Sequence, residues 1–115
     1  MAIKKFLDKG LEAVIMTRKR NRKPTHPGYF FKVDVLAANN VSISEAARTL
    51  GVSRKHLSAF VNEKVPCSRD LAKRLALATE TSIASWLSMQ AAVDVWEAEH
   101  DDSAHYDAVG KIAFG

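Results

Sequence analysis

Side chains suited to binding a polyanion are concentrated between Ser44 and Lys64. Hydrogen-bond donors and cations follow one another there at Ser53, Arg54, Lys55, His56, Ser58, Asn62 and Lys64. Arginine or lysine can donate to O6 and N7 of guanine, and asparagine can pair with adenine. Serine hydroxyls and a helix N-terminus can bond phosphates. These residues, together with Ser44, are therefore our candidates for contacts with double-stranded DNA.

Two short helices joined by a tight turn are predicted to position these side chains. Ser42 and Glu45 match the capping-box pattern that begins a helix, and Gly51 is expected to end that helix. Ser53 then caps a second helix only a few residues later. The small Ala47 lets the two helices cross closely. The pattern predicts a helix-turn-helix whose second helix enters a major groove about 12 Å wide.

The same two helices supply an apolar side and an outward side. The apolar residues expected inside are Ala46, Ala47, Leu50, Val52, Leu57, Phe60 and Val61. Arg54 and Lys55 have no evident structural duty, so we expect them to point outward. Ser53 can serve both as a cap and as a contact. Asn62 has two interpretations of equal weight, a helix end or a base contact.

Three further helices are predicted around this pair. One runs from Pro27 to about Ala38, one starts at Ser68, and the last and longest starts at Ser82. The expected inward residues are Phe30, Phe31, Val35 and Leu36 in the first, and Leu71, Ala72, Leu75 and Ala78 in the second. Asn39 and Asn40 are expected to end the first helix in left-handed backbone. No strand pattern precedes Tyr106, and residues 106–114 are either strand-like or disordered.

The last helix has a narrow polar stripe at Gln90, Asp94, Glu97 and Asp101, and the rest of its circumference is apolar. One small domain can hardly cover that much apolar surface, so we expect one face in the core and another against a second copy. The residues expected at this dimer interface are Trp86, Met89, Val93 and Trp96. The alternative is a central helix that the chain itself buries completely.

Charge divides the chain into three parts. Residues 1–25 carry eight Lys or Arg against two Asp or Glu, whereas residues 97–115 carry one Lys against five acids. We predict a basic N-terminal extension at 1–25, a DNA-binding domain at 26–100 and a short acidic tail at 101–115. Ile3 to Ile15 suggests a short amphipathic helix, and Met16 is an alternative start. The basic residues from Arg18 to Lys23 form either an arm that contacts DNA or a solvated segment.

The composition argues for a cytoplasmic protein without membrane spans. The first sixteen residues lack the apolar run of a secretory signal, and the sequence has no stretch of about 20 apolar residues. Cys67 is the single cysteine, so a disulfide within the chain is excluded, as is typical of a reducing compartment.

An enzyme is disfavoured, and no cofactor is expected. The four histidines are scattered, with no carboxylate pair or serine elbow near them. His100 and His105, with Asp101 and Asp102, are a metal-site hypothesis. Their spacing places the two imidazoles on different helix faces, so a solvated tail is favoured.

Several ordered motifs resemble those of the HigA family of antitoxins, whose helix-turn-helix is of the Cro and phage-repressor (XRE-like) type. The motifs are Thr25-His26-Pro27-Gly28, Gly51-Val52-Ser53-Arg54-Lys55, Leu57-Ser58, Val61-Asn62 with Lys64, and Trp86-Leu87-Ser88-Met89-Gln90 followed by Asp94 and Trp96. They cover about residues 24–98. Tyr29, Val33 and Ala59 depart from the family, which more often has acidic or long polar residues there.

This resemblance implies an all-α, five-helix, lambda-repressor-like domain. It also implies a homodimer that represses its own operon at a palindromic operator and neutralises a HigB-like toxin, a ribosome-dependent mRNA endonuclease. Two other functions stay open. One is a free-standing phage-type regulator without a toxin, and the other is an interaction module whose last helix docks another protein. A neighbouring reading frame for a small basic toxin would distinguish the antitoxin from the free-standing regulator.

Overall fold

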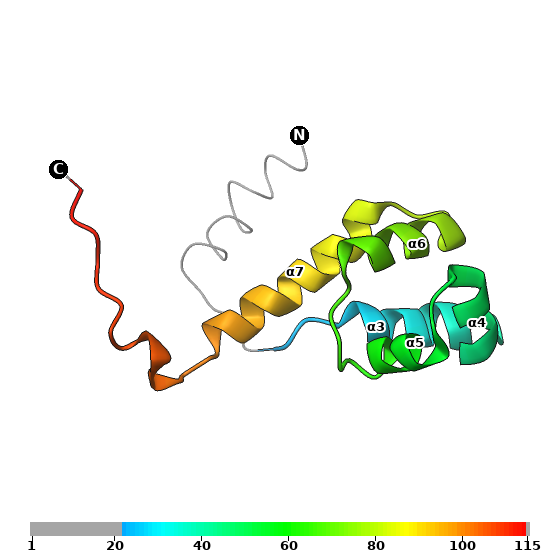
Figure 1. The fold of residues 1–115 in the computed structure, drawn as a ribbon, viewed down its shortest axis with the longest axis horizontal. Coiled ribbons are helices and arrows are strands. Elements are labelled where there is room, and N and C mark those ends of the chain that lie inside the picture. Colours follow the sequence, from blue (N-terminus) through cyan, green and yellow to red (C-terminus); the bar gives the residue numbers. More distant parts are fainter. Residues whose placement is uncertain (1–21, 115) are drawn as a thin grey trace.

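A computed structural model of the protein describes residues 22–114, and Figure 1 shows their arrangement. The elements are α3 (Pro27–Phe30), η2 (Phe31–Ala37), α4 (Ile43–Leu50), α5 (Arg54–Val61), α6 (Arg69–Thr79), α7 (Ile83–Glu99) and the short η3 (Ala104–Tyr106). Since η2 continues α3, the described part contains the five predicted helices and no strand. The amphipathic helix predicted at 3–15, the alternative start at Met16 and most of the basic arm lie outside the described residues.

Four helices begin at the predicted serines. Each serine hydroxyl accepts a hydrogen bond from the backbone N–H three residues later, at N···O distances of 3.0–3.1 Å. The four capping residues are Ser42, Ser53, Ser68 and Ser82. Each cap satisfies one of the N–H groups that a helix start leaves free, which explains why these starts are readable from local sequence. At Ser42 the described hydrogen bonds include the serine half of the capping box but not a return bond from Glu45.

The first helix differs from the expected uniform α-helix because Phe31–Ala37 is a π-helix. A π-helix bonds residues five apart, so it brings Phe31 and Leu36 to the same side. Both side chains are buried, at 3% and 5% exposed. The helix is followed by Asn40 with a φ of 54°, which confirms the predicted left-handed end.

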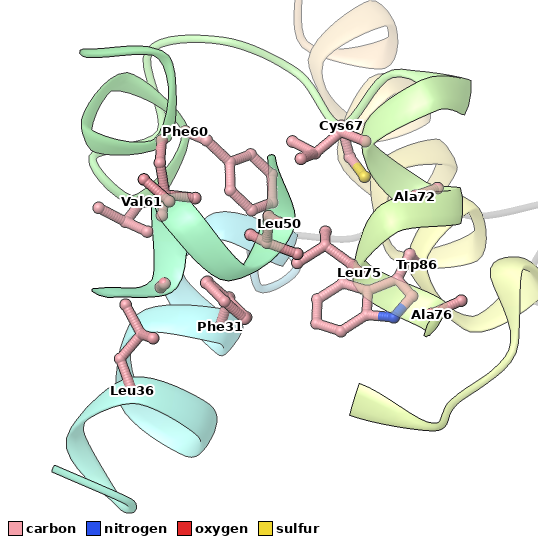
Figure 2. Packing of buried hydrophobic residues seen from close by; sticks show 14 residues of the cluster. Phe31, Leu36, Leu50, Phe60, Val61, Cys67, Ala72, Leu75, Ala76 and Trp86 are labelled. Carbon is pink, nitrogen blue, oxygen red and sulfur yellow. The ribbon is translucent and has the colours of Figure 1, made fainter. Parts of the chain in front are cut away.

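The core lies where the helices meet (Figure 2). Leu50 and Leu75 point toward each other between α4 and α6, beside Phe31 and Trp86. The Phe31 and Trp86 rings meet edge to face, with centroids 6.1 Å apart. Ala78 was expected in this core but is exposed, and Ala76 is buried instead. Ala78 lies in the last turn of α6, where it lines an open hollow with Val35 and Val41 instead of packing closely against them.

The predicted polar stripe of α7 is wrong at Gln90, which is only 7% exposed. Its side chain accepts a hydrogen bond from the backbone N–H of Cys67 at 2.7 Å and donates one to Asp94 at 2.9 Å. Gln90 therefore faces inward and ties α7 to the segment between α5 and α6.

The burial of α7 also reduces the set of residues that can form the predicted dimer interface. Trp86 and Val93 are each 1% exposed, because the chain's own side chains cover them. Such residues offer no surface to a second copy. Met89 and Trp96, seven residues apart, remain partly exposed on α7.

The tail after α7 is largely exposed. Apart from η3 it has no regular structure up to Phe114, so the strand-like alternative for 106–114 is not found. Within residues 22–114, no helix combines the length and apolar character needed to cross a membrane.

Candidate DNA-binding surface

The turn between α4 and α5 has the predicted geometry. Gly51 adopts a φ of 73°, a left-handed conformation that glycine reaches without a steric penalty. Its N–H donates to Ala47 O at 2.9 Å, and Val52 N donates to the same oxygen at 3.1 Å. Ala47 is 4% exposed. The small side chain and the compact turn let α5 begin within four residues of the end of α4.

Helix α5 separates an inward side from an outward one, as expected. Leu57, Phe60 and Val61 are at most 3% exposed, and Phe60 lies in the centre of the core. The exposed residues at its N-terminal end are Ser53, Arg54, Lys55 and His56. The prediction that Arg54 and Lys55 point away from the protein body is therefore confirmed. This end presents two cations on a helix start, where free N–H groups also favour an anion.

The other candidate residues differ in how exposed they are. Ser44 and Ser58 are half-buried, whereas Lys64 is exposed beyond the end of α5. Asn62 is the C-cap of α5, and its side-chain amide donates to Ser58 O at 2.9 Å. This contact supports the helix-end interpretation of Asn62, because one of its amide hydrogens is already used within the helix.

Helix α5 rests on the start of α3 at very close range. A β-carbon placed on Gly28 would lie 1.8 Å from the backbone oxygen of Phe60, so only glycine fits there. The preceding His26 caps α3: its Nδ1 accepts a hydrogen bond from Gly28 N at 2.9 Å. Its ring also lies 5.9 Å from that of Phe60, centroid to centroid. The His26-Pro27-Gly28 motif thus packs directly against α5, at Phe60.

Burial keeps the His26 ring neutral. Desolvation is the largest effect on its pKa and lowers it, and Lys23 acts in the same direction, while Glu63 opposes them. The cap of α3 requires a neutral ring, because Nδ1 can accept a hydrogen bond only when it carries no proton.

Arg74 is a residue of this region that the sequence patterns did not identify. It lies on α6, yet its Nη1 donates to Leu50 O at 2.9 Å and to Gly51 O at 3.3 Å. Its Nε donates to Asp70 at 2.8 Å. The four-residue spacing of Asp70 and Arg74 is visible in the sequence. The contact with residues 23 and 24 positions earlier is not.

The described end of the basic arm contacts α7. Lys23 Nζ lies 3.3 Å from a carboxylate oxygen of Glu97 and 5.7 Å from the centroid of the Trp96 ring. Trp96 in turn stacks on His100, with centroids 4.1 Å apart. Arg18 to Asn21, the rest of the predicted arm, lie outside the described residues.

The titratable residues of the tail do not assemble into a metal site. Among residues 22–114, no three His, Cys, Asp or Glu side chains are grouped as metal ligands would be. His100 Nδ1 lies 2.8 Å from Trp96 O within α7. Cys67 is buried, and burial raises the pKa of its thiol to about 11.

Known proteins resemble this chain in sequence and in fold. The chain is 37% identical to the uncharacterized HTH-type transcriptional regulator YbaQ of Escherichia coli K12 over 84 residues, which are 73% of this chain and 74% of that protein. It is 32% identical to antitoxin HigA-1 of Vibrio cholerae over 80 residues, or 70% of this chain and 75% of that protein. No protein-family model matches the sequence.

A solved structure gives the same similarity in three dimensions. The Pseudomonas aeruginosa antitoxin HigA, in a structure with the higBA promoter, superposes with a TM-score of 0.64 at 27% identity. The match covers 72% of this chain and 99% of that one. The two chains therefore share the same overall fold over most of their lengths.

Proposed function

The chain belongs to the family of HTH-type transcriptional regulators that includes the HigA antitoxins, and we propose that it is the antitoxin of a toxin–antitoxin module. In this proposal it binds double-stranded DNA as a sequence-specific repressor of its own operon. It also binds and neutralises a HigB-like toxin. It acts in the cytoplasm, is not an enzyme and needs no cofactor.

The observation that carries the DNA-binding proposal is the outward position of Arg54 and Lys55 at the start of α5. In a helix-turn-helix, the N-terminal residues of the second helix are the ones that face base edges. Arg54 is suited to a bidentate contact with guanine, and Lys55 to a guanine or a phosphate. Ser53 and His56 lie in the same turn.

The surrounding residues fit a supporting role on the DNA backbone. Ser44, Ser58 and Lys64 flank the two helices and carry groups that can bond phosphate oxygens. We assign Asn62 to the end of α5, with adenine pairing as the less favoured role. A homodimer formed through Met89 and Trp96 on α7 would bind two half-sites about 34–36 Å apart, or a multiple of that distance, and would require a palindromic operator.

The first test measures DNA binding as a function of salt. Duplexes covering the promoter of its own gene are compared with scrambled duplexes of the same length. We expect tighter binding to one promoter duplex and a log–log salt slope of about −0.9 per phosphate contact. Equal binding to all duplexes, or an affinity that does not change with salt, would contradict the proposal.

The second test addresses the toxin. The product of the reading frame next to this gene is co-expressed with the full chain, and a stable complex that restores growth supports the antitoxin assignment. Specific DNA binding without such a complex would support a free-standing regulator instead. The observation behind that alternative is the similarity to YbaQ, an HTH-type transcriptional regulator.

A further inference from the structure

We propose that Arg74, outside the helix-turn-helix, positions α5 for reading DNA by holding the turn that precedes it. This inference rests on the proposed DNA-binding function. Arg74 reaches from the middle of α6 to the last residues of α4, and Leu50 and Gly51 accept its two hydrogen bonds from Nη1.

The C-terminal end of α4 is where a cation is most useful. The last carbonyl groups of a helix lack partners within the helix and carry a partial negative charge. The Arg74 guanidinium supplies both a donor and a positive charge to these groups. The ion pair between Arg74 Nε and Asp70, at 2.8 Å along α6, keeps the guanidinium aimed at the turn.

Gly51 leaves room for this contact. A β-carbon at position 51 would lie 2.9 Å from Arg74 Nη1, closer than side-chain atoms normally approach. The left-handed φ of 73° already favours glycine at this position, and the absence of a side chain lets the guanidinium approach the turn without being displaced.

The position of the turn determines where the DNA-facing cations point. Ser53 follows Gly51 by two residues and caps α5, and Arg54 is the first residue of that helix. Helix α6, which carries Arg74, packs against both α4 and α7. Arg74 therefore connects the supporting helices to the start of α5, and its loss should let Arg54 and Lys55 change their direction relative to the rest of the molecule.

A different role must be separated from this one. The Arg74 side chain is 40% exposed, so it could instead bond a DNA phosphate directly. A direct phosphate contact contributes equally to all sequences and steepens the salt dependence. A positioning residue changes the preference for one sequence without changing the number of phosphate contacts.

The experiment uses the full chain and three changes near this contact. Arg74→Met keeps the apolar stem and removes every donor, Arg74→Lys keeps the charge but has no planar fork, and Asp70→Asn removes the ion pair. Lys73→Met is the matched control, since Lys73 is an exposed cation on the same helix. Binding to the preferred promoter duplex and to its scrambled partner is measured at several salt concentrations, below the unfolding temperature of each variant.

We expect Arg74→Met to lower the ratio of specific to non-specific affinity by about tenfold, with the salt slope unchanged from that of Lys73→Met. Arg74→Lys and Asp70→Asn should each lower this affinity ratio by less than Arg74→Met does. If Arg74→Met does not fold, these two variants carry the test.

Two outcomes would overturn the inference. One is that Arg74→Met loses the same affinity for both duplexes and has a log–log salt slope smaller in magnitude by about 0.9 than that of the unmodified chain, which identifies a phosphate contact. The other is an unchanged affinity ratio in the folded variants. Neither outcome affects the proposed DNA-binding function, because that function is tested separately by the promoter preference and the salt dependence of the unmodified chain.

Discussion

At the scale of single residues, the histidine at position 26 sets the start of the first helix. Its Nδ1 replaces the serine oxygen that caps the other helices, and its ring packs against Phe60 of α5. The cap therefore depends on the protonation state of one imidazole. Because the same ring packs against Phe60, protonation of His26 also affects the contact between α3 and α5.

Acidification should weaken the fold through His26. Its folded pKa lies below the ordinary value of 6.5, so between those two values the unfolded chain binds more protons than the folded chain. The contribution of the neutral ring is complete above pH 6.5 and is lost as the pH falls through the folded pKa. Urea unfolding at about pH 7.5 and about pH 5 should show the loss.

His26→Asn provides the control, because asparagine keeps a capping acceptor and does not titrate. This variant should lose less stability between the two pH values than the unmodified chain. The exposed His56, His100 and His105 remain in both proteins, so they cancel in the comparison. An equal loss in the variant would show that the pH dependence arises elsewhere.

Arg54 makes the second prediction at this scale. Arg54→Ala should weaken binding to the preferred duplex by about 1–3 kcal/mol if its guanidinium contacts a base. Because the side chain is exposed, stability should change by no more than about 0.5 kcal/mol. Arg54→Lys retains the charge but not the fork, so it should keep non-specific binding and lose preference. A loss of equal size on scrambled DNA would reassign Arg54 to a phosphate.

At the scale of elements, Gln90 joins α7 to the segment that follows α5, the proposed DNA-binding helix. The backbone N–H of Cys67 has its acceptor on Gln90, 23 residues later in the chain. The buried amide therefore holds the start of α6 and the middle of α7 at a set separation.

Gln90→Leu should lower the free energy of unfolding by about 1–3 kcal/mol, because the buried N–H of Cys67 would lose its partner. Chemical denaturation measures the change. Asp94→Asn is the matched comparison. Asp94 is exposed, and it accepts a hydrogen bond from the side-chain Nε2 of Gln90, not from the backbone of Cys67. If both variants lost the same stability, the hydrogen bond to Cys67 would not be the cause.

Elements whose signals are local were predictable from sequence. Ser42, Ser53, Ser68 and Ser82 each act on a group three residues away, and the periodic apolar residues that follow them identify the buried sides of the helices. The left-handed ends at Asn40 and Gly51 were readable for the same reason.

Features that depend on tertiary contacts were not predictable. Gln90 is a polar residue in a stripe of polar residues, and its buried position depends on the backbone of Cys67. Arg74 is one cation among many until α6 packs beside the end of α4. The π-helix at Phe31–Ala37 was not predictable either, because its apolar residues Phe31 and Leu36 are expected to face inward in an α-helix as well.

At the scale of the whole molecule, the helices proposed to bind DNA lie apart from the acidic C-terminal tail. Helices α3, α4 and α5 lie together at one end, and the C-terminal part of α7 leads away from them into the tail (Figure 1). On α7, the proposed interface residues Met89 and Trp96 remain partly exposed. A second copy on this helix would leave α5 of both copies free.

Trp96→Asp should therefore give a monomer that binds the promoter duplex weakly. The carboxylate would place a charge in the proposed interface, and a monomer contacts only one half-site. Sedimentation measures the mass, and circular dichroism checks that the helices persist. Val95→Asp, an exposed position on another side of α7, is the control. A dimer that survives Trp96→Asp but not Val95→Asp would move the interface to the Val95 side.

The buried thiol of Cys67 has a practical consequence. It is the only cysteine of the sequence, and its raised pKa keeps it in the unreactive, protonated form at neutral pH. A cysteine introduced on the surface would thus be the one site that a maleimide dye modifies. Donor and acceptor fluorophores attached there would report, by energy transfer, the spacing of two copies on a promoter without any need to remove the native residue.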